Sequence, residues 1–355
     1  MRWEINDLLT ATSKLPFKFT SKLACFDLDG TLIKTKSGKR FPQDENDWIF
    51  FSENVESKLN ELHKNGYCII IITNQSGLSD GTKREQWKKK LDQISTKIAL
   101  PIKLFCSISH DLYRKPLPTI MEKLISPAVP NIDFTKSFFC GDACGRQGDH
   151  SDCDYKFALN TDLKFRLPEE LFNGEAAVIP DISYEAFDEI GKIRANPVFV
   201  PREKEMILMV GYPGSGKSKY TNDVLVPLDY TRINRDTLKT QAKCLKFTKK
   251  VLEEGKNVVI DNTNYDEKNR AAYIKLAEAY EYSVRCIIID ASYEVALHNS
   301  MYRFYKGNGA IIPQIVYRLY KKNYKEPLLT EKIEQIIKIT PEYKQNDPDY
   351  KLYLF

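Results

Sequence analysis

The 355-residue sequence contains no long hydrophobic run. Its longest apolar stretches, residues 68–72 and 206–210, have the length of a strand, whereas a helix that spans a bilayer needs about 20 apolar residues. Residues 1–15 alternate charged and apolar side chains and lack the uninterrupted apolar segment of a signal peptide. We therefore expect an intracellular protein, in a reducing environment, that does not contact a membrane.

The sequence also lacks internal repeats, low-complexity tracts and a strong excess of charge of one sign. The formal net charge is +5, and 42% hydrophobic with 28% charged residues is ordinary for a folded globular protein. At this length the chain can form two domains, each with its own core. The weak positive charge permits a polyanionic partner without requiring one.

The eight cysteines do not follow a disulfide or zinc-binding pattern. Most lie in or beside apolar runs, where a free thiol packs as a small hydrophobic group. Cys140, Cys144, His150 and Cys153 are close together in the sequence, but their spacing is not that of a zinc ribbon or finger. We do not expect a zinc site.

Three basic runs stand out at residues 88–90, 246–250 and 317–325, and the last interleaves tyrosine with lysine and arginine. Such runs usually form the solvated face of a helix, which is our interpretation of each. Contact with a nucleic-acid strand is the alternative.

Apolar strand-like segments alternate with helical segments in two series. The first series contains strands that begin at Leu23 and cover residues 67–73, 102–107 and 137–141, with helices at 53–64 and 83–98. The second contains strands at residues 206–210, 258–260 and 285–289. This alternation predicts two doubly wound α/β domains, each with a parallel sheet covered by helices.

The proline-containing region near residues 166–204 has no sustained periodicity and separates the two series. We therefore divide the chain into an N-terminal extension (1–21), a first domain (22–170), a linker (171–203) and a second domain (204–355).

The first predicted strand ends in the motif Asp-x-Asp-Gly-Thr. Asp27 and Asp29 are two positions apart, so in an extended chain they point to the same side, and Gly30 permits the turn that follows. Two neighbouring carboxylates repel each other unless a cation or a shared proton relieves them. Mg²⁺ meets this need because it binds carboxylate and phosphate oxygens.

Three further polar motifs follow in order: Thr73-Asn74, Arg114-Lys115-Pro116 and Gly141-Asp142. Each comes at or after the predicted carboxyl end of a strand, where open α/β sheets bind ligands. This ordered set resembles the haloacid dehalogenase superfamily of phosphatases.

The resemblance implies a role for each residue. Asp27 is the nucleophile that forms an aspartyl-phosphate, and Asp29 protonates the leaving oxygen and then activates water. Thr73 and Lys115 hold the phosphoryl oxygens. Asp142 completes an Mg²⁺ site with Asp27 and the backbone carbonyl of Asp29.

The intervals between these motifs are short. Sheet and helix segments occupy the residues between Asp27, Thr73 and Lys115, which leaves no room for the separate cap domain that encloses small substrates in many relatives. We therefore expect an open site that accepts a macromolecular substrate.

The second domain begins with a phosphate-binding loop. Residues 211–218 (GYPGSGKS) match G-x-x-x-x-G-K-[ST], follow a predicted strand and open a helical segment. In such a loop the backbone N–H groups converge on phosphate, the lysine reaches the β and γ oxygens, and the hydroxyl binds Mg²⁺. The ATP-binding residues predicted from this loop are Gly211, Gly214, Ser215, Gly216, Lys217 and Ser218.

A kinase also needs a base for the attacking hydroxyl. Asp236, in the sequence NRD, is a candidate base, although it could instead cap the helix that follows. The polar residues of segment 258–264 (VVIDNTN) could likewise serve only to form a turn.

Taken together, GYPGSGKS, NRDTL, VVIDNTN, Arg270 and the segment 296–303 resemble the kinase half of the eukaryotic polynucleotide kinase 3′-phosphatase family. The first half resembles the same family at residues 37–39, 47–48, 73–75 and 157–160, so the likeness covers about residues 22–355. It implies that Asp236 is the general base, that Asp261 and Arg270 line the acceptor or phosphate side, and that Arg303 stabilises the transferring phosphoryl group.

The resemblance implies a nuclear, monomeric DNA-repair enzyme that uses Mg²⁺ and ATP. It would remove 3′-phosphates from DNA or RNA ends and phosphorylate 5′-hydroxyl ends, and it would act alongside a DNA ligase and a repair polymerase. We expect no forkhead-associated domain, because only about twenty residues precede Leu23. The alternatives are a small-molecule phosphatase and kinase, or a nucleotide-dependent binding module.

Overall fold

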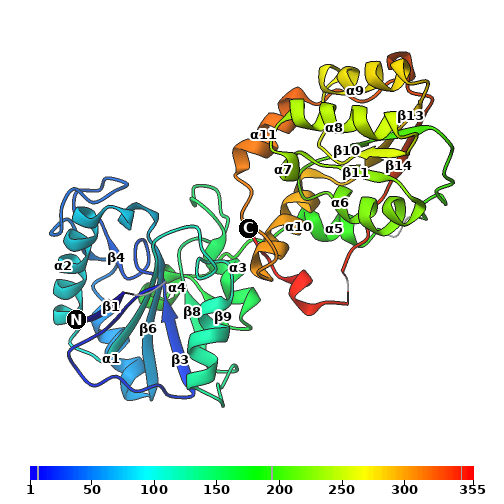
Figure 1. Cartoon of the computed structure of the whole chain (residues 1–355). Helices are drawn as coiled ribbons and strands as arrows, with labels where there is room; N and C mark the ends of the chain where they lie inside the picture. Colours follow the sequence, from blue (N-terminus) through cyan, green and yellow to red (C-terminus); the bar gives the residue numbers. More distant parts are fainter. Residues whose placement is uncertain (6–7, 193–194, 345) are drawn as a thin grey trace. The chain divides into compact units, whose positions relative to one another are not determined.

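The computed structural model describes residues 1–5, 8–192, 195–344 and 346–355, and the chain divides into two units. The first unit contains Met1–Ser183 together with Leu352–Phe355, and the second contains Tyr184–Lys351. Each unit is a sheet with helices on both sides (Figure 1). None of the helices in the described part of the chain combines the length and the apolarity that crossing a bilayer would need.

The sheet of the first unit is mixed. Its described strands, in their order across the sheet, are β1 (Arg2–Ile5), β2 (Leu9–Thr12), β7 (Ile102–Ser107), β6 (Tyr67–Asn74), β3 (Lys22–Phe26), β8 (Phe138–Cys140) and β9 (Lys164–Arg166). The strands from β7 to β9 are parallel, whereas β1 and β2 add an antiparallel hairpin at one edge. The hairpin β4 (Ile33–Lys34) and β5 (Ile49–Phe50) follows β3, and the helices are α1 (Val55–Lys64), α2 (Gly81–Ile98), α3 (Cys153–Asn160) and α4 (Pro168–Asn173).

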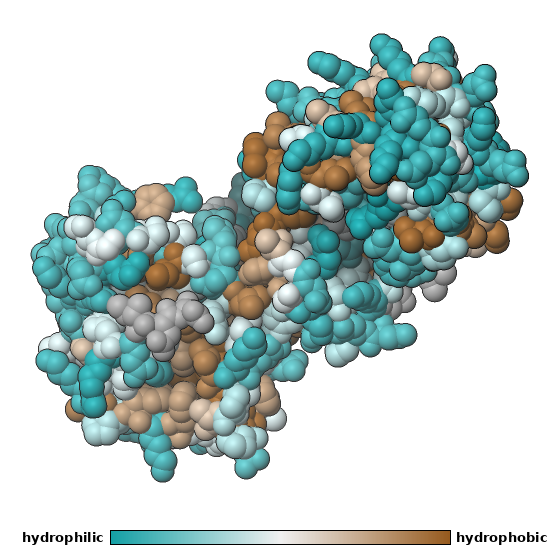
Figure 2. All heavy atoms as spheres, viewed as in Figure 1, coloured by the Kyte–Doolittle hydropathy of each residue, from teal (hydrophilic) through white to brown (hydrophobic). Residues whose placement is uncertain are grey.

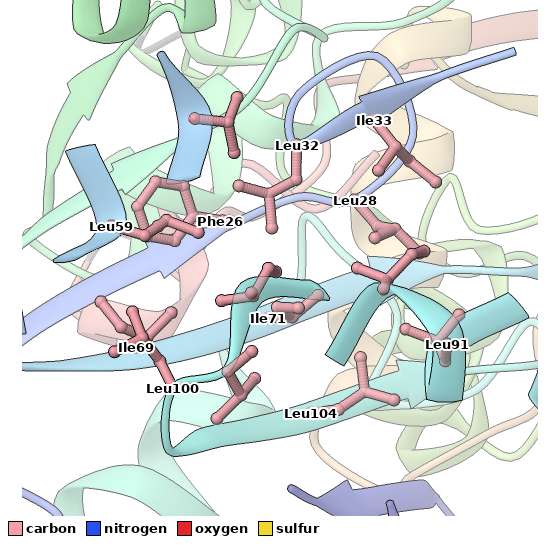
Figure 3. Packing of buried hydrophobic residues seen from close by; sticks show 14 of the residues in the cluster. Phe26, Leu28, Leu32, Ile33, Leu59, Ile69, Ile71, Leu91, Leu100 and Leu104 are labelled. Atoms are coloured by element: carbon pink, nitrogen blue, oxygen red, sulfur yellow. The ribbon is translucent and has the colours of Figure 1, made fainter. Parts of the chain in front are cut away.

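Both faces of this sheet are buried, which explains why its strands are continuous apolar runs. Alternate residues of a strand point to opposite faces. Ala24 and Phe26 pack in one core cluster, whereas Leu23 and Cys25 pack in the other. Figure 3 shows the first cluster, in which Phe26 lies beside Leu59 of α1. The doubly wound architecture is thus confirmed for this unit.

The second unit has a parallel sheet. Its described strands, in order across the sheet, are β11 (Thr231–Ile233), β12 (Val258–Ile260), β10 (Glu205–Val210), β13 (Ser283–Ile289) and β14 (Gln335–Ile339). Its helices are α5 (Glu185–Ile190), α6 (Lys217–Tyr220), α7 (Arg235–Leu238), α8 (Gln241–Glu253), α9 (Glu267–Ala279), α10 (Tyr293–Tyr305) and α11 (Gln314–Asn323). Hydrophilic side chains cover much of the face of this unit that Figure 2 shows.

Three predicted domain assignments need correction. Residues 1–21 are not an extension outside the first domain, because β2 pairs with β7 and continues its sheet. Residues 171–203 are not wholly a linker, because α5 packs against α10 through the rings of Tyr184, Phe187 and His298. The last residues, Leu352–Phe355, belong to the first unit and not to the second.

Candidate active sites

The first site lies where β3, β6 and β8 end. The backbone N–H of Asp27 donates to the carbonyl of Cys140 at 2.9 Å, which continues the pairing of β3 with β8. The buried Lys115 reaches this point and donates to Oδ1 of Asp27 at 2.6 Å. Asn74 fixes the backbone of Lys115 through two hydrogen bonds of 3.0 Å, one to its carbonyl and one from its N–H. Residues from three motifs thus meet.

Lys115 also contacts a carboxylate that the sequence reasoning missed. Its Nζ donates to Oδ1 of Asp154 at 2.7 Å, and Oδ2 of Asp154 accepts from the backbone N–H of Ala143 at 3.2 Å. Burial acts to lower the pKa of Lys115, but the charges of Asp154 and Asp27 outweigh this effect and raise it. Lys115 is therefore a fixed positive charge in this site.

Asp27, Asp142 and Asp154 form a cluster in which one oxygen of each lies within 4.8 Å of the others. Burial, followed by the charge of Asp154, raises the pKa of Asp142 to about 6, and burial also raises the pKa of Asp27. Two glycines make this crowding possible, since a Cβ at Gly30 would overlap Asp142 and one at Gly141 would overlap Asp154.

The cluster suits a divalent cation. It brings three carboxylates around one lysine, and a hard cation that takes oxygen ligands would neutralise the remaining repulsion. Within the described residues, this is the one group of histidine, cysteine and acidic side chains close enough to hold a metal ion. The cysteines form no such group, and all eight are free thiols.

The side chain of Asp29 lies at the mouth of the site and is 45% exposed. Its Oδ2 accepts from Nε2 of Gln75 at 2.6 Å, and its Oδ1 accepts from Nζ of Lys90 at 3.2 Å. Gln75 also donates to Oγ1 of Thr73 at 3.1 Å, so the donor that holds Asp29 also contacts the predicted phosphate-binding threonine.

The second site is the loop between β10 and α6. Gly211, Gly214 and Gly216 all have positive φ values, of 151°, 82° and 104°, which glycine adopts readily. Gly214 also lies against α10, because a Cβ there would overlap the carbonyl of Ala296. The turn therefore favours glycine at all three positions, and the packing of the loop on α10 requires it at Gly214.

Lys217 is buried and folded back onto this loop. Its Nζ donates to the carbonyls of Gly211 at 2.9 Å and Tyr212 at 2.6 Å. Burial lowers the pKa of Lys217 to about 8, and among the nearby charges those of Asp261 and Asp236 oppose this shift while that of Arg303 adds to it. These three predicted site residues therefore lie close enough to act on Lys217.

The structure contradicts one of the two interpretations of Asp236, that it caps the helix that follows. The side chain of Asn234 caps α7 by accepting from the backbone N–H groups of Asp236 and Thr237. Asp236 itself is exposed. Because another residue caps the helix, the carboxylate of Asp236 remains available for the role of a base.

Asp261 is buried beside the P-loop. Its Oδ2 accepts from Oγ of Ser218 at 2.7 Å and from Nε of Arg232 at 2.8 Å, while Oδ1 has no hydrogen-bond partner. Asn234 donates to its backbone carbonyl at 2.7 Å, which joins the NRD and DNTN segments. The contact with Ser218 places Asp261 beside the P-loop, and its position on the acceptor or phosphate side, which the resemblance implied, stays a prediction.

The prediction that Arg270 lines the acceptor or phosphate side needs correction. Its guanidinium is fully buried and donates to both carboxylate oxygens of Glu331, at 2.8 and 2.7 Å, and to the carbonyls of Asn264 and Lys325. Because these partners occupy it, we assign Arg270 a structural role instead of a phosphate contact. Arg303, in contrast, is exposed on α10.

The first unit thus combines a doubly wound sheet with a cluster of carboxylates at its strand ends, as in phosphatases of the haloacid dehalogenase type, and the second is a P-loop kinase. Comparisons with known proteins agree with this class. The sequence matches the family described as "Polynucleotide kinase 3 phosphatase" over residues 22–172 and the "AAA domain" family over residues 206–327. The chain belongs to the bifunctional polynucleotide phosphatase/kinase family.

Three relatives illustrate this relationship. A bifunctional polynucleotide phosphatase/kinase of Schizosaccharomyces pombe is 35% identical and aligns over 93% of this chain and 82% of its own length. A polynucleotide 3′-phosphatase of Arabidopsis thaliana is 37% identical over 43% of this chain and 24% of its own length. A polynucleotide 3′-phosphatase of Saccharomyces cerevisiae is 27% identical over 42% of this chain and 86% of its own length.

Proposed function

We propose that this enzyme repairs the ends of broken DNA strands by removing 3′-phosphates in its first unit and phosphorylating 5′-hydroxyl groups in its second. The observation that carries the proposal is that one chain of this family contains both a cluster of three carboxylates around Lys115 and a P-loop. Ligation requires a 3′-hydroxyl and a 5′-phosphate, so the two reactions together produce ends that a DNA ligase can join. From this role we also propose that the enzyme is located in the nucleus and acts beside a DNA ligase and a repair polymerase.

In the phosphatase reaction, a carboxylate oxygen of Asp27 attacks phosphorus while Asp29 gives a proton to the departing 3′-oxygen. Asp29 then takes a proton from the water that hydrolyses the aspartyl-phosphate. Lys115 and Thr73 contact the phosphoryl oxygens, and Asp27, Asp142 and the newly identified Asp154 are the side chains that would hold Mg²⁺. The metal supplies positive charge that offsets the approach of a carboxylate to a phosphate dianion.

In the kinase reaction, the P-loop amides and Lys217 bind the phosphates of ATP. Ser218 and Asp261 are the residues that would hold Mg²⁺ beside these phosphates. Asp236 accepts the proton of the attacking 5′-hydroxyl, and Arg303 stabilises the phosphoryl group during transfer. Phosphatases and P-loop kinases of these folds generally use Mg²⁺ and ATP.

Access to the phosphatase site supports a strand as substrate. The residues between β3 and β6 form only the β4–β5 hairpin and α1, and those between β6 and β7 form a helical turn and α2; both intervals are fully described. The loop of the β4–β5 hairpin carries the exposed Lys36, Lys39, Arg40 and Phe41. Asp47 orders this loop through hydrogen bonds from Ser37 and Gln43. Basic groups with an exposed ring suit a phosphate backbone and an unpaired base.

One doubly labelled oligonucleotide with a 5′-hydroxyl and a 3′-phosphate tests the proposal. We expect loss of the 3′-label and ATP-dependent gain of a 5′-phosphate, with Asp27→Asn abolishing only the first reaction and Lys217→Met only the second. DNA and RNA versions of the oligonucleotide measure the preference between them. Equal activity on a nucleoside 3′-monophosphate and on the oligonucleotide would replace this proposal with the small-molecule alternative, and no turnover would leave only a binding module.

A further inference from the structure

Lys90 is an exception to the pattern of the helix that contains it. The buried face of α2 is otherwise apolar, with Trp87, Leu91, Ile94 and Ile98 facing the core, and Figure 3 shows Leu91 within it. Lys90 lies on the same buried face and is only 3% exposed. The interpretation of residues 88–90 as a solvated helix face is therefore wrong for Lys90.

Burying an ammonium group is unfavourable unless a partner compensates for the lost water. Nζ of Lys90 lies 3.2 Å from Oδ1 of Asp29, which is the proposed acid and base of the phosphatase. An apolar residue at this position would complete the helix face without a desolvation cost. The stability of the fold alone therefore does not explain a lysine at this position.

The other oxygen of Asp29 is held as well. Gln75, which follows β6, donates to Oδ2 at 2.6 Å. A carboxylate that is 45% exposed would otherwise turn between several rotamers. Two donors from different elements, α2 and the end of β6, fix both oxygens.

We propose that Lys90, together with Gln75, is a positioning residue that orients Asp29 and stabilises its carboxylate between the two halves of the phosphatase reaction. In the first half, the Asp27–phosphorus bond forms, the bond to the leaving oxygen breaks, and the proton of Asp29 moves to that oxygen. The resulting carboxylate lies between the Lys90 ammonium and the Gln75 amide. In the second half, water attacks phosphorus, its proton moves to Asp29, and phosphate leaves Asp27.

This inference rests on the proposed role of Asp29 as acid and base, and its test depends on the leaving group. A 3′-phosphorylated oligonucleotide releases an alkoxide, which needs a proton, whereas p-nitrophenyl phosphate releases a stable anion, which does not. With enzyme in excess, release of the leaving group reports the first half-reaction alone. For Lys90→Met we expect this step to slow by roughly tenfold to a hundredfold on the oligonucleotide and by less than about threefold on the aryl phosphate.

Further readouts separate positioning from damage to the fold. In steady state, Lys90→Met should lower kcat on the oligonucleotide with a KM change below about threefold. Combining Lys90→Met with Asp29→Asn should lower kcat no further than Asp29→Asn alone, since the residue that Lys90 positions is already disabled. Lys89→Met changes the exposed neighbour on the same helix and should behave as wild type. Gln75→Leu repeats the test at the other oxygen of Asp29, should Lys90→Met fail to fold.

Equal slowing on both substrates, a wild-type rate for Lys90→Met, or full additivity with Asp29→Asn would each overturn the inference. A wild-type enzyme that is inactive on both substrates would instead refute the proposed phosphatase function. Kinase activity of each variant on a 5′-hydroxyl oligonucleotide should be unchanged, because the P-loop belongs to the other unit.

Discussion

Replacing Asp154 by asparagine keeps the size of the side chain and removes its negative charge. The contacts of Asp154 with the phosphatase site are apparent only from the structure. Its two oxygens accept from two donors, the ammonium of Lys115 at 2.7 Å and the backbone N–H of Ala143 at 3.2 Å. An asparagine amide has only one oxygen, so one of these buried donors would face an NH₂ group in either orientation. A buried donor without an acceptor costs about 1–3 kcal/mol.

The substitution also removes one of three negative charges from the cluster with Asp27 and Asp142. Weaker metal binding and a displaced Lys115 both act on the transition state. A combined loss of about 3 kcal/mol corresponds to about a hundredfold lower kcat/KM, since each 1.4 kcal/mol is about tenfold. We also expect the Mg²⁺ concentration that gives half-maximal phosphatase rate to rise by about tenfold or more.

The assay follows removal of a 3′-phosphate from an oligonucleotide across a series of Mg²⁺ concentrations. Asp152→Asn is a matched control, because Asp152 lies two residues away, forms an ion pair with Lys156 at 2.8 Å and is outside the carboxylate cluster. The 5′-kinase rate of the same preparations serves as an internal control. If Asp154→Asn kept the phosphatase within about threefold of wild type at every Mg²⁺ concentration, the assignment of Asp154 to the site would be wrong.

Three further predictions concern other parts of the chain. Asp236→Asn should lower kinase turnover by about a hundredfold or more while ATP affinity, measured calorimetrically, stays near normal; lost affinity would instead assign Asp236 to nucleotide binding. Burial lowers the pKa of His298 to about 4. The unfolding free energy of the second unit should therefore fall by roughly 3 kcal/mol as the pH falls from about 6.5 to 4. The unfolding free energy of His298→Gln, measured by denaturation, should depend less on pH. Asn160→Ala removes two hydrogen bonds with the backbone of Tyr353, of 2.7 and 2.8 Å, and a third to the carbonyl of Pro116 at 2.8 Å. It should lower the unfolding free energy of the first unit by about 1–3 kcal/mol in urea titrations, and a wild-type value would contradict a stabilising role for these bonds.

The parts of the fold that were predictable are those that the chain specifies locally. A strand buried on both faces must be continuously apolar. The motifs that begin at Asp27 and at Gly211 each follow such a strand and contain glycines that permit a sharp turn. The edge hairpin β1–β2 was missed because four-residue strands carry little signal, and only pairing with β7 reveals their place.

The residues that were missed depend on tertiary contacts. An aspartate in the first turn of a helix, such as Asp154, is common for electrostatic reasons, and nothing local indicates that it meets Lys115. Helical periodicity could have indicated Lys90, because it lies three residues after Trp87 and four before Ile94, on the apolar face. The partner of Arg270 is 61 positions away, so the sequence alone could not separate a structural arginine from a phosphate ligand.

Lys115 and Lys217 give the two active sites different requirements for a cation. Lys115 contacts two carboxylates, with a third nearby, so this pocket is anionic before a phosphate arrives and its substrate would meet net repulsion. Lys217 instead donates to two backbone carbonyls, which leaves its charge available to the phosphates of ATP. We therefore expect excess EDTA to abolish binding of a 3′-phosphorylated end to the phosphatase site, yet only to weaken nucleotide binding at the P-loop. Fluorescence titrations of Asp236→Asn with a labelled nucleotide and of Asp29→Asn with a labelled 3′-phosphorylated oligonucleotide would measure both, because the side chain of Asp29 is outside the carboxylate cluster. Equal losses would contradict this electrostatic distinction.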